Sequence, residues 1–185
     1  MGTHNLGIDK GSAKIYVQIK EGILTWWIDI YSDVKEIEDI DWGVQLYCED
    51  LRLELKHWRD LGTVKIEFED CWDEEIDDNI AGIYVFEHED VKNTTIEMKA
   101  IKDNFFQIEW KGIGLVSGEE YEIFVFTEIE FTEIVSWSLN LEESNQWFSK
   151  YFNLEDYHIG DPEITNHHNG KDIGRIIYTP KLNML

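Results

Sequence analysis

Hydrophobic and polar residues alternate with a period of two along much of the chain. The alternation is clearest at residues 24–31, 64–68 and 106–111, where every second side chain is apolar. Such a pattern is typical of half-buried β-strands. Two-residue turn signals join residues 13–20 to 23–31 at Glu21-Gly22, and residues 94–101 to 105–111 at Asp103-Asn104. We therefore expect β-hairpins, and from them an antiparallel sheet.

Residues 121–141 keep a strand-like phase for longer than one ordinary strand. We expect a break near Thr132-Glu133, either between two strands or as a bend that carries one strand from one sheet into another. Phe124 and Phe126 are apolar on the opposite phase. This predicts a central strand covered on both faces.

Residues 48–61 fit two interpretations. Leu51, Leu53 and Leu55 have strand spacing, whereas Leu51, Leu55 and Trp58 have helical spacing, with Gly62 placed as a C-cap. We favour a strand. Because the preceding apolar residues alternate on the opposite parity, that strand requires a bulge near Glu49-Asp50.

The end of the chain has a different pattern. Residues 141–152 predict a helix, with Asn140 and Glu143 resembling a capping box. After it, residues 153–185 are polar and turn-rich, apart from a strand candidate at 175–179. The two prolines, Pro162 and Pro180, both lie in this last part, and no linker composition precedes them.

These elements predict one domain over residues 1–185. It would comprise a flexible N-terminus (1–12), a β-rich core (13–140), a helix (141–152) and a loosely structured tail (153–185). The fold class that we expect is mainly β, an antiparallel β-sandwich or jelly-roll-like pair of sheets with one helix near the C-terminus.

Charge narrows the possible partners. The chain carries 16 Lys plus Arg against 39 Asp plus Glu, a formal net charge of −23. Such a surface repels nucleic-acid phosphates and anionic membrane leaflets. Among charged partners, only a cationic one would be attracted to it. Hydrophobic residues make up 43% of the chain, which is enough for a sizeable core. We find no secretory signal in residues 1–12 and no apolar run that could span a bilayer, and we expect a cytoplasmic protein.

Motifs for catalysis, cofactors or metals are missing from the sequence. Cys48 and Cys71 lack C-x-x-C spacing, and we expect both to be buried or inert. His158, His167 and His168 follow no metal-ligand spacing. Neither G-x-S-x-G nor a phosphate-binding glycine loop is present. We predict no catalytic residue, no cofactor and no metal site, and therefore a protein that is not an enzyme.

The densest cluster of charge lies at residues 69–78, where seven carboxylates occur in ten residues. Mutual repulsion predicts an extended, solvated loop unless a cation neutralises it. Calcium is one hypothesis, although the EF-hand order is absent. The other is docking of a basic protein, with one aromatic anchor inside an acidic rim. The predicted partner-binding residues are Asp70, Trp72, Asp73, Glu74, Glu75, Asp77 and Asp78.

Two further acidic stretches could extend this surface. One comprises Asp33, Glu36, Glu38, Asp39 and Asp41, which alternate with apolar residues that we expect to face the core. The other comprises Glu128, Glu130 and Glu133. If these stretches shared one rim with residues 69–78, they would form a continuous negative patch.

In size, acidity and aromatic content, and in no specific motif, the chain resembles the small acidic immunity proteins that neutralise nuclease toxins. The resemblance implies a cytoplasmic inhibitor that masks a basic protein such as a nuclease toxin. The alternative is a carbohydrate- or calcium-binding β-sandwich module without catalytic activity. Trp26-Trp27 gives this alternative some support, because strand alternation leaves one of the two rings outside the core for sugar stacking.

Overall fold

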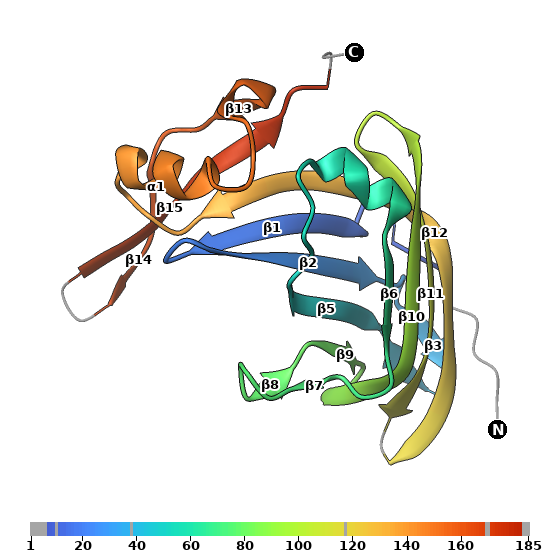
Figure 1. Ribbon diagram of the computed structural model, residues 1–185. Helices are drawn as coiled ribbons and strands as arrows, with labels where there is room; N and C mark the ends of the chain where they lie inside the picture. The colour runs from blue at the N-terminus through green and yellow to red at the C-terminus, as the bar shows by residue number, and fades with distance from the viewer. Residues whose placement is uncertain (1–6, 10, 38, 117, 169–170, 183–185) are drawn as a thin grey trace.

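A computed structural model describes residues 7–9, 11–37, 39–116, 118–168 and 171–182. Seven strands of its main sheet close into a β-barrel (Figure 1). In spatial order they are β1 (Lys14–Lys20), β2 (Ile23–Tyr31), β5 (Gln45–Leu51), β9 (Ala81–Tyr84), β10 (His88–Lys102), β11 (Phe105–Val116) and β12 (Glu119–Ser136). Neighbours around the barrel are antiparallel until β12 returns to β1 and pairs with it in parallel.

The predicted sandwich or jelly-roll-like pair of sheets is therefore wrong, although the mainly β character holds. Closure depends on the length of β12. Its residues 119–130 pair with β11, and its residues 130–136 pair with β1. A single long strand thus joins the last hairpin to the first and closes the sheet. The hydrophobic core therefore lies inside one barrel and not between two packed sheets.

The predicted hairpins β1–β2 and β10–β11 are confirmed. Lys20 pairs with Ile23 across the first turn, and Lys102 pairs with Phe105 across the second. Glu21 and Gly22 have φ of 53° and 77°, the positive values that the favoured two-residue hairpin turn requires.

The strand β12 continues through the predicted break, and only a bulge lies at that position. Ile15 pairs with Phe131 and Val17 pairs with Ile134, so Thr132 and Glu133 together lie opposite Tyr16 and β12 has one extra residue there. The bulge changes the parity of the strand and keeps both Phe131 and Ile134 inside the barrel. β12 curves from the barrel wall toward the C-terminal part of the chain rather than into a second sheet (Figure 1).

The ambiguous segment combines a strand and a short helix. β5 ends at Leu51 and has an irregular register between Cys48 and Leu51, with Asp50 at φ 51°, so the expected bulge near Glu49-Asp50 is confirmed. The chain then leaves the sheet and forms the 3-10 helix η1 (Trp58–Thr63). The helical spacing of Leu51, Leu55 and Trp58 therefore does not correspond to one continuous helix.

The core fills the inside of the barrel, and η1 covers one end of it (Figure 1). Trp58 is 1% exposed, lies stacked on Phe131 with ring centroids 5.6 Å apart, and meets Phe106 edge to face at 6.2 Å. A reciprocal cap holds η1 in place, because the His57 ring accepts from the Arg59 N–H and the Asp60 carboxylate accepts from the His57 N–H.

The C-terminal part is more ordered than the sequence predicted. α1 (Leu141–Phe148) ends four residues early, and β13 (Tyr157–Ile159), β14 (Glu163–His168) and β15 (Lys171–Pro180) follow the short helix η2 (Leu154–Asp156). β15 pairs with β12 and β13, and the Tyr178 ring stacks on Phe148 at 4.2 Å. This packing orders residues that by composition alone resemble a tail.

The predicted cap of α1 is confirmed in part. The Asn140 side chain accepts from the N–H groups of Glu142 and Glu143. The Glu143 carboxylate accepts instead from the Ser138 hydroxyl at 2.7 Å.

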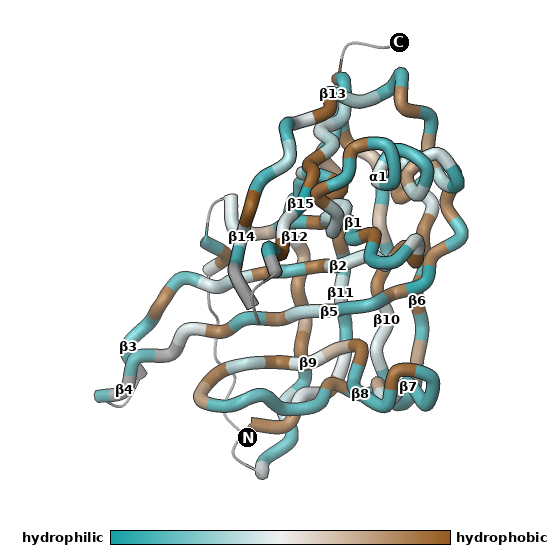
Figure 2. The backbone as a smooth tube through the Cα atoms, turned by 90° about the vertical axis from the view of Figure 1, so that its left-hand side faces the viewer, coloured by the Kyte–Doolittle hydropathy of each residue, from teal (hydrophilic) through white to brown (hydrophobic). Residues whose placement is uncertain are grey.

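Short strands complete the fold. β6 (Lys65–Phe68) pairs with β10 beside β9. Two small hairpins, β3 (Lys35–Ile37) with β4 (Ile40–Trp42) and β7 (Trp72–Asp73) with β8 (Asp78–Asn79), form sheets of their own. They lie on opposite sides of the barrel (Figures 1 and 2).

Candidate functional site

The sequence-predicted binding residues lie in and around the β7–β8 hairpin, here called the acidic hairpin (residues 69–79). It is folded rather than extended, because its own carboxylates bind its backbone. Asp70, Asp73 and Asp78 each accept a hydrogen bond from an N–H one or two residues further along, at 2.8 to 3.1 Å. These bonds offset part of the repulsion that the sequence predicts.

Buried contacts attach the acidic hairpin to the barrel. The Cys71 thiol is buried and lies 3.2 Å from the Asn79 side-chain oxygen, and the Asn79 amide donates to Asp90 at 2.7 Å. Trp72 is 49% exposed, and the exposed Glu75 pairs with Arg52. The acidic hairpin therefore presents one aromatic ring among exposed carboxylates.

The second acidic stretch lies in the β3–β4 hairpin, on the other side of the barrel from the acidic hairpin (Figure 2). The two do not form one continuous patch. Val34 at its start is 68% exposed, so the expectation that the apolar side of this stretch faces the core is wrong there. Glu38 lies outside the described residues.

Sequence reasoning misplaced the most exposed aromatic residues of the β12 wall. Phe124 and Phe126 were expected to be covered, but they are 64% and 59% exposed on the outside of the barrel. On the neighbouring strand, Lys111 is opposite Phe124 with its ammonium 5.7 Å from the ring centroid, and Glu109 is opposite Phe126. The reason is that a barrel strand is covered on its inner face, whereas none of the described residues forms a second layer over this stretch of the outer face.

Glutamates share the outer row of β12 with these two rings. Glu120 and Glu122 come before the phenylalanines, Glu128 comes after them, and all three are exposed. We call these five residues the β12 stripe. It has the arrangement that was expected at Trp72, aromatic anchors within an acidic rim, but on a long β-strand. The signal for it in the sequence was a Glu or Phe at every second position from 120 to 128.

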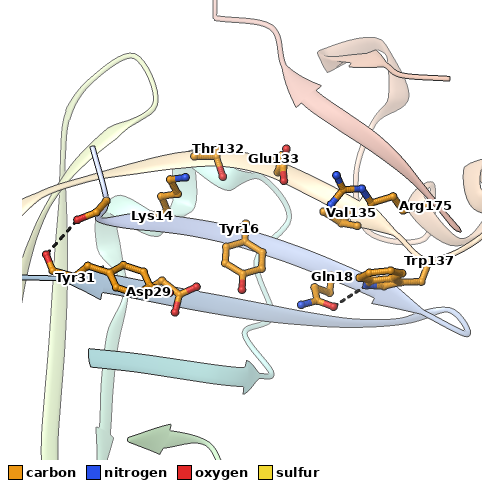
Figure 3. Close-up of a pocket in the computed structure, with 11 residues that line it drawn as sticks. Lys14, Tyr16, Gln18, Asp29, Tyr31, Thr132, Glu133, Val135, Trp137 and Arg175 are labelled. Carbon is orange, nitrogen blue, oxygen red and sulfur yellow. Dashed lines mark hydrogen bonds between the residues drawn. The ribbon is translucent and has the colours of Figure 1, made fainter. Parts of the chain in front are cut away.

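A separate hollow of about 520 Å³ lies on the outer wall, here called the outer cleft (Figure 3). It is framed by β1, β2, β12 and β15, and no motif in the sequence marks it. Its side chains lie on the polar phase of these strands, which the alternation assigned to solvent. The lining residues are Ser12, Lys14, Tyr16, Gln18, Asp29, Tyr31, Thr132, Glu133, Val135, Trp137 and Arg175.

Hydrogen bonds fix several of these side chains. The Trp137 indole N–H donates to the Gln18 side-chain oxygen at 2.7 Å, which orients the Gln18 amide group (Figure 3). Asp29 accepts from the Gln45 amide at 3.0 Å. The Tyr16 ring lies 5.9 Å from that of Trp27, which is half-buried on the outer wall while Trp26 is in the core.

Titration near this wall is shifted by burial and by neighbouring acids. Burial, followed by the charge of Asp29, raises the pKa of Tyr16. On β5, the strand beyond β2, burial raises the pKa of Glu49 from 4.5 to about 7, and the charges of Asp29, Asp50 and Asp78 add to the rise. Glu49 therefore binds a proton close to neutral pH, although it does not line the cleft.

Neither the two thiols nor the residue types that bind metals form a functional site among the described residues. Cys48 and Cys71 are both free and buried, as expected, and burial raises the pKa of each thiol. Within the described ranges, no group of three or more His, Cys, Asp or Glu is placed to hold a metal ion. His158 lies on β13, and the side chains of His167 and His168 are outside the described ones.

The fold and the surface together define an acidic seven-stranded barrel with an aromatic and acidic stripe on its outer wall. No protein-family model matches the chain, and no curated protein or solved structure is similar enough to count as a match. In the part of the chain that the structure describes, no helix is long and apolar enough to cross a membrane.

Proposed function

We propose that the protein is a cytoplasmic inhibitor that binds and masks a basic protein, such as a nuclease toxin, in the manner of an immunity protein. The observation that carries the proposal is the β12 stripe, where two exposed phenylalanines lie between exposed glutamates. Its two free, buried thiols suit a reducing compartment.

Aromatic anchors are the kind of feature that dominates binding energy at protein interfaces. Each ring leaves apolar area in water that a partner can bury, at roughly 25 cal/mol per Å². The surrounding carboxylates favour a partner whose own apolar patch is ringed by Lys and Arg. The net charge of −23 attracts such a partner over long range and accelerates association.

The acidic hairpin is a second contact surface in this proposal. Trp72 would insert into the partner, and Asp70, Asp73, Glu74, Glu75, Asp77 and Asp78 would face its cations. It lies apart from the β12 stripe in sequence and belongs to a different small sheet. Separate substitutions can therefore test the two surfaces independently.

The experiment starts from low-salt affinity capture, identification of the captured basic protein, and binding kinetics with that protein purified. Replacing Phe124 and Phe126 together by Ser should weaken binding at least tenfold, mainly through faster dissociation. Reversing Asp73, Glu74 and Asp77 to Lys should slow association and flatten its salt dependence.

The matched control reverses Glu142 and Glu155, two exposed acids of the C-terminal part, to Lys. This control raises the net charge by four units, against six for the variant of the acidic hairpin, and touches neither surface. If binding by the phenylalanine variant equals that of the unmodified protein, the β12 stripe is not the interface. If no basic protein binds the unmodified chain, the inhibitor proposal fails.

The outer cleft supports a second candidate function, carbohydrate binding. Tyr16, Tyr31 and Trp137 supply aromatic rings there, and the oriented Gln18 amide supplies hydrogen-bond donors. A sugar held by the folded state alone should raise the thermal midpoint, and Gln18→Ala should remove that rise. A glycan panel that leaves both the midpoint and the Trp fluorescence unchanged would reject this candidate.

A further inference from the structure

The β12 stripe borders an open strand edge. Residues Glu119–Glu130 of β12 pair with β11 on one side, but β1 joins the other side only from Glu130 onward. Among the residues that the structure describes, no strand pairs with that other side between Glu119 and Ile129. Roughly ten residues of β12 therefore form an edge strand within an otherwise closed barrel.

Two hydrogen bonds reveal which residues face the open edge. The Phe131 N–H donates toward β11, to the Asn104 carbonyl at 2.8 Å, and the Glu130 N–H donates the opposite way, to the Ala13 carbonyl at 3.2 Å. Successive residues of an antiparallel strand direct their N–H and C=O groups to alternate edges. Even-numbered residues from Glu122 to Glu128 thus direct theirs to the open edge.

Backbone and side chains therefore converge on one surface. Glu122, Phe124, Phe126 and Glu128 direct their N–H and C=O groups along the edge and place their side chains on the outer face. No strand among the described residues pairs with these groups, and the Glu128 carbonyl accepts from the Thr127 hydroxyl at 3.4 Å. The alternate residues, including Ile123 and Val125, are half-buried and pack against the core from inside. A strand added here would continue both faces of the barrel wall.

We infer that the basic partner binds by adding an extended segment as a strand along this edge of β12. The inference rests on the proposed function and specifies its binding mode. The added segment would alternate Lys or Arg on the outer face, beside the glutamates and the two rings, with apolar residues on the inner face. The cation of Lys111 over the Phe124 ring already shows one such contact within the barrel.

The charges along the edge favour a cationic segment over a second copy of this chain. Antiparallel self-pairing centred on Phe124 would place Glu120 opposite Glu128 and would align four glutamates along the shared edge. Like charges directly opposite each other on a sheet destabilise the pairing. A cationic segment relieves the same repulsion and gains main-chain hydrogen bonds.

Hydrogen exchange of the full-length chain tests the inference, using a capped ten-residue peptide of alternating Lys and Val as the probe. In the free protein, amides of Ile123 and Val125 should exchange slowly and those of Phe124 and Phe126 quickly. Adding the peptide at low salt should slow Phe124 and Phe126 at least tenfold. The same peptide N-methylated at alternate residues on the pairing edge should not protect them.

Phe126→Pro and Phe126→Ala form a matched pair of variants. Both remove the ring, but only proline removes the N–H that faces the open edge, and it breaks no hydrogen bond to β11. The proline variant should bind the peptide at least tenfold more weakly than the alanine variant. Equal affinities, absent protection of Phe124 and Phe126, or equal binding of the N-methylated peptide would each overturn strand addition.

The proposed function is judged separately, with the basic protein itself. If that protein binds the Phe126→Pro and Phe126→Ala variants equally, strand addition is refuted while the inhibitor proposal stands. If it binds neither these variants nor the unmodified chain, both fail.

Discussion

Replacing Glu49 by Gln should make the protein more stable at alkaline pH. Glu49 lies at the bulge of β5, half-buried, and its N–H donates to the Ile80 carbonyl at 2.8 Å. Burial, with Asp29, Asp50 and Asp78 nearby, raises its pKa to about 7. Because the folded state holds this proton more tightly than the unfolded state, its contribution is fully present below about pH 4.5. It is lost as the pH rises through about 7.

The magnitude follows from the two pKa values. A rise from 4.5 to about 7 corresponds to roughly 3 kcal/mol if none of it is screened. Because Glu49 is only half-buried and water screens its charge, we expect about 1 kcal/mol. Gln has the same shape and no charge, so Glu49→Gln keeps the packing and removes the ionisation that costs stability above neutrality.

Urea denaturation at pH 4 and pH 8 measures the effect directly. The variant and the unmodified protein should have similar free energies of unfolding at pH 4, and the variant should be more stable by about 1 kcal/mol at pH 8. Glu142→Gln, an exposed position on α1, is the control for loss of one surface charge. A variant that is less stable at pH 8, or whose pH dependence matches that of the unmodified protein, would refute the reasoning.

Three further substitutions test the packing, each by urea denaturation. Trp58→Ala leaves a cavity at one end of the barrel core and should lower the free energy of unfolding by about 3–5 kcal/mol. Trp72→Ala, at an exposed ring, should lower it by less than about 1 kcal/mol. Similar losses in the two variants would contradict the assignment of Trp58 to the core. Gly62→Ala would place a methyl group 2.8 Å from the Ala100 Cβ and 2.9 Å from its N, and should cost about 1–3 kcal/mol, so an unchanged midpoint would argue against this close approach. Asn140→Ala removes the cap of α1 and should cost about 1 kcal/mol, while Asn140→Asp should retain most of the stability; equal losses would show that the side-chain oxygen is not the cap.

Local features of this fold were predictable because they depend on neighbouring residues. The Glu21-Gly22 turn and the bulges near Asp50 and Thr132 follow from changes in alternation and from turn composition. Barrel closure was not predictable in this way. It depends on Lys14 meeting Glu130, a pairing between distant segments that no local pattern encodes.

The composition of the surface was predictable from the sequence, but the arrangement of its side chains was not. The density of acids at residues 69–78 was evident, but the hydrogen bonds by which Asp70 and Asp73 fold that segment were not. Phe124 and Phe126 were assigned to a covered face because two apolar phases usually mean two packed layers. Whether a layer exists outside a strand is decided by the rest of the fold, so exposed aromatics on a barrel wall look in sequence like a central strand.

The parallel pairing of β1 with β12 has a consequence for the order of folding. β1 leaves the ribosome early, yet its partner residues 130–136 are made only after every intervening barrel strand. Until then, β1 and β2 form a hairpin whose outer edge has no neighbour. Closing so large a loop is entropically slow and leaves that edge accessible to other chains. The nascent protein should therefore be most prone to aggregation just before residue 136 emerges.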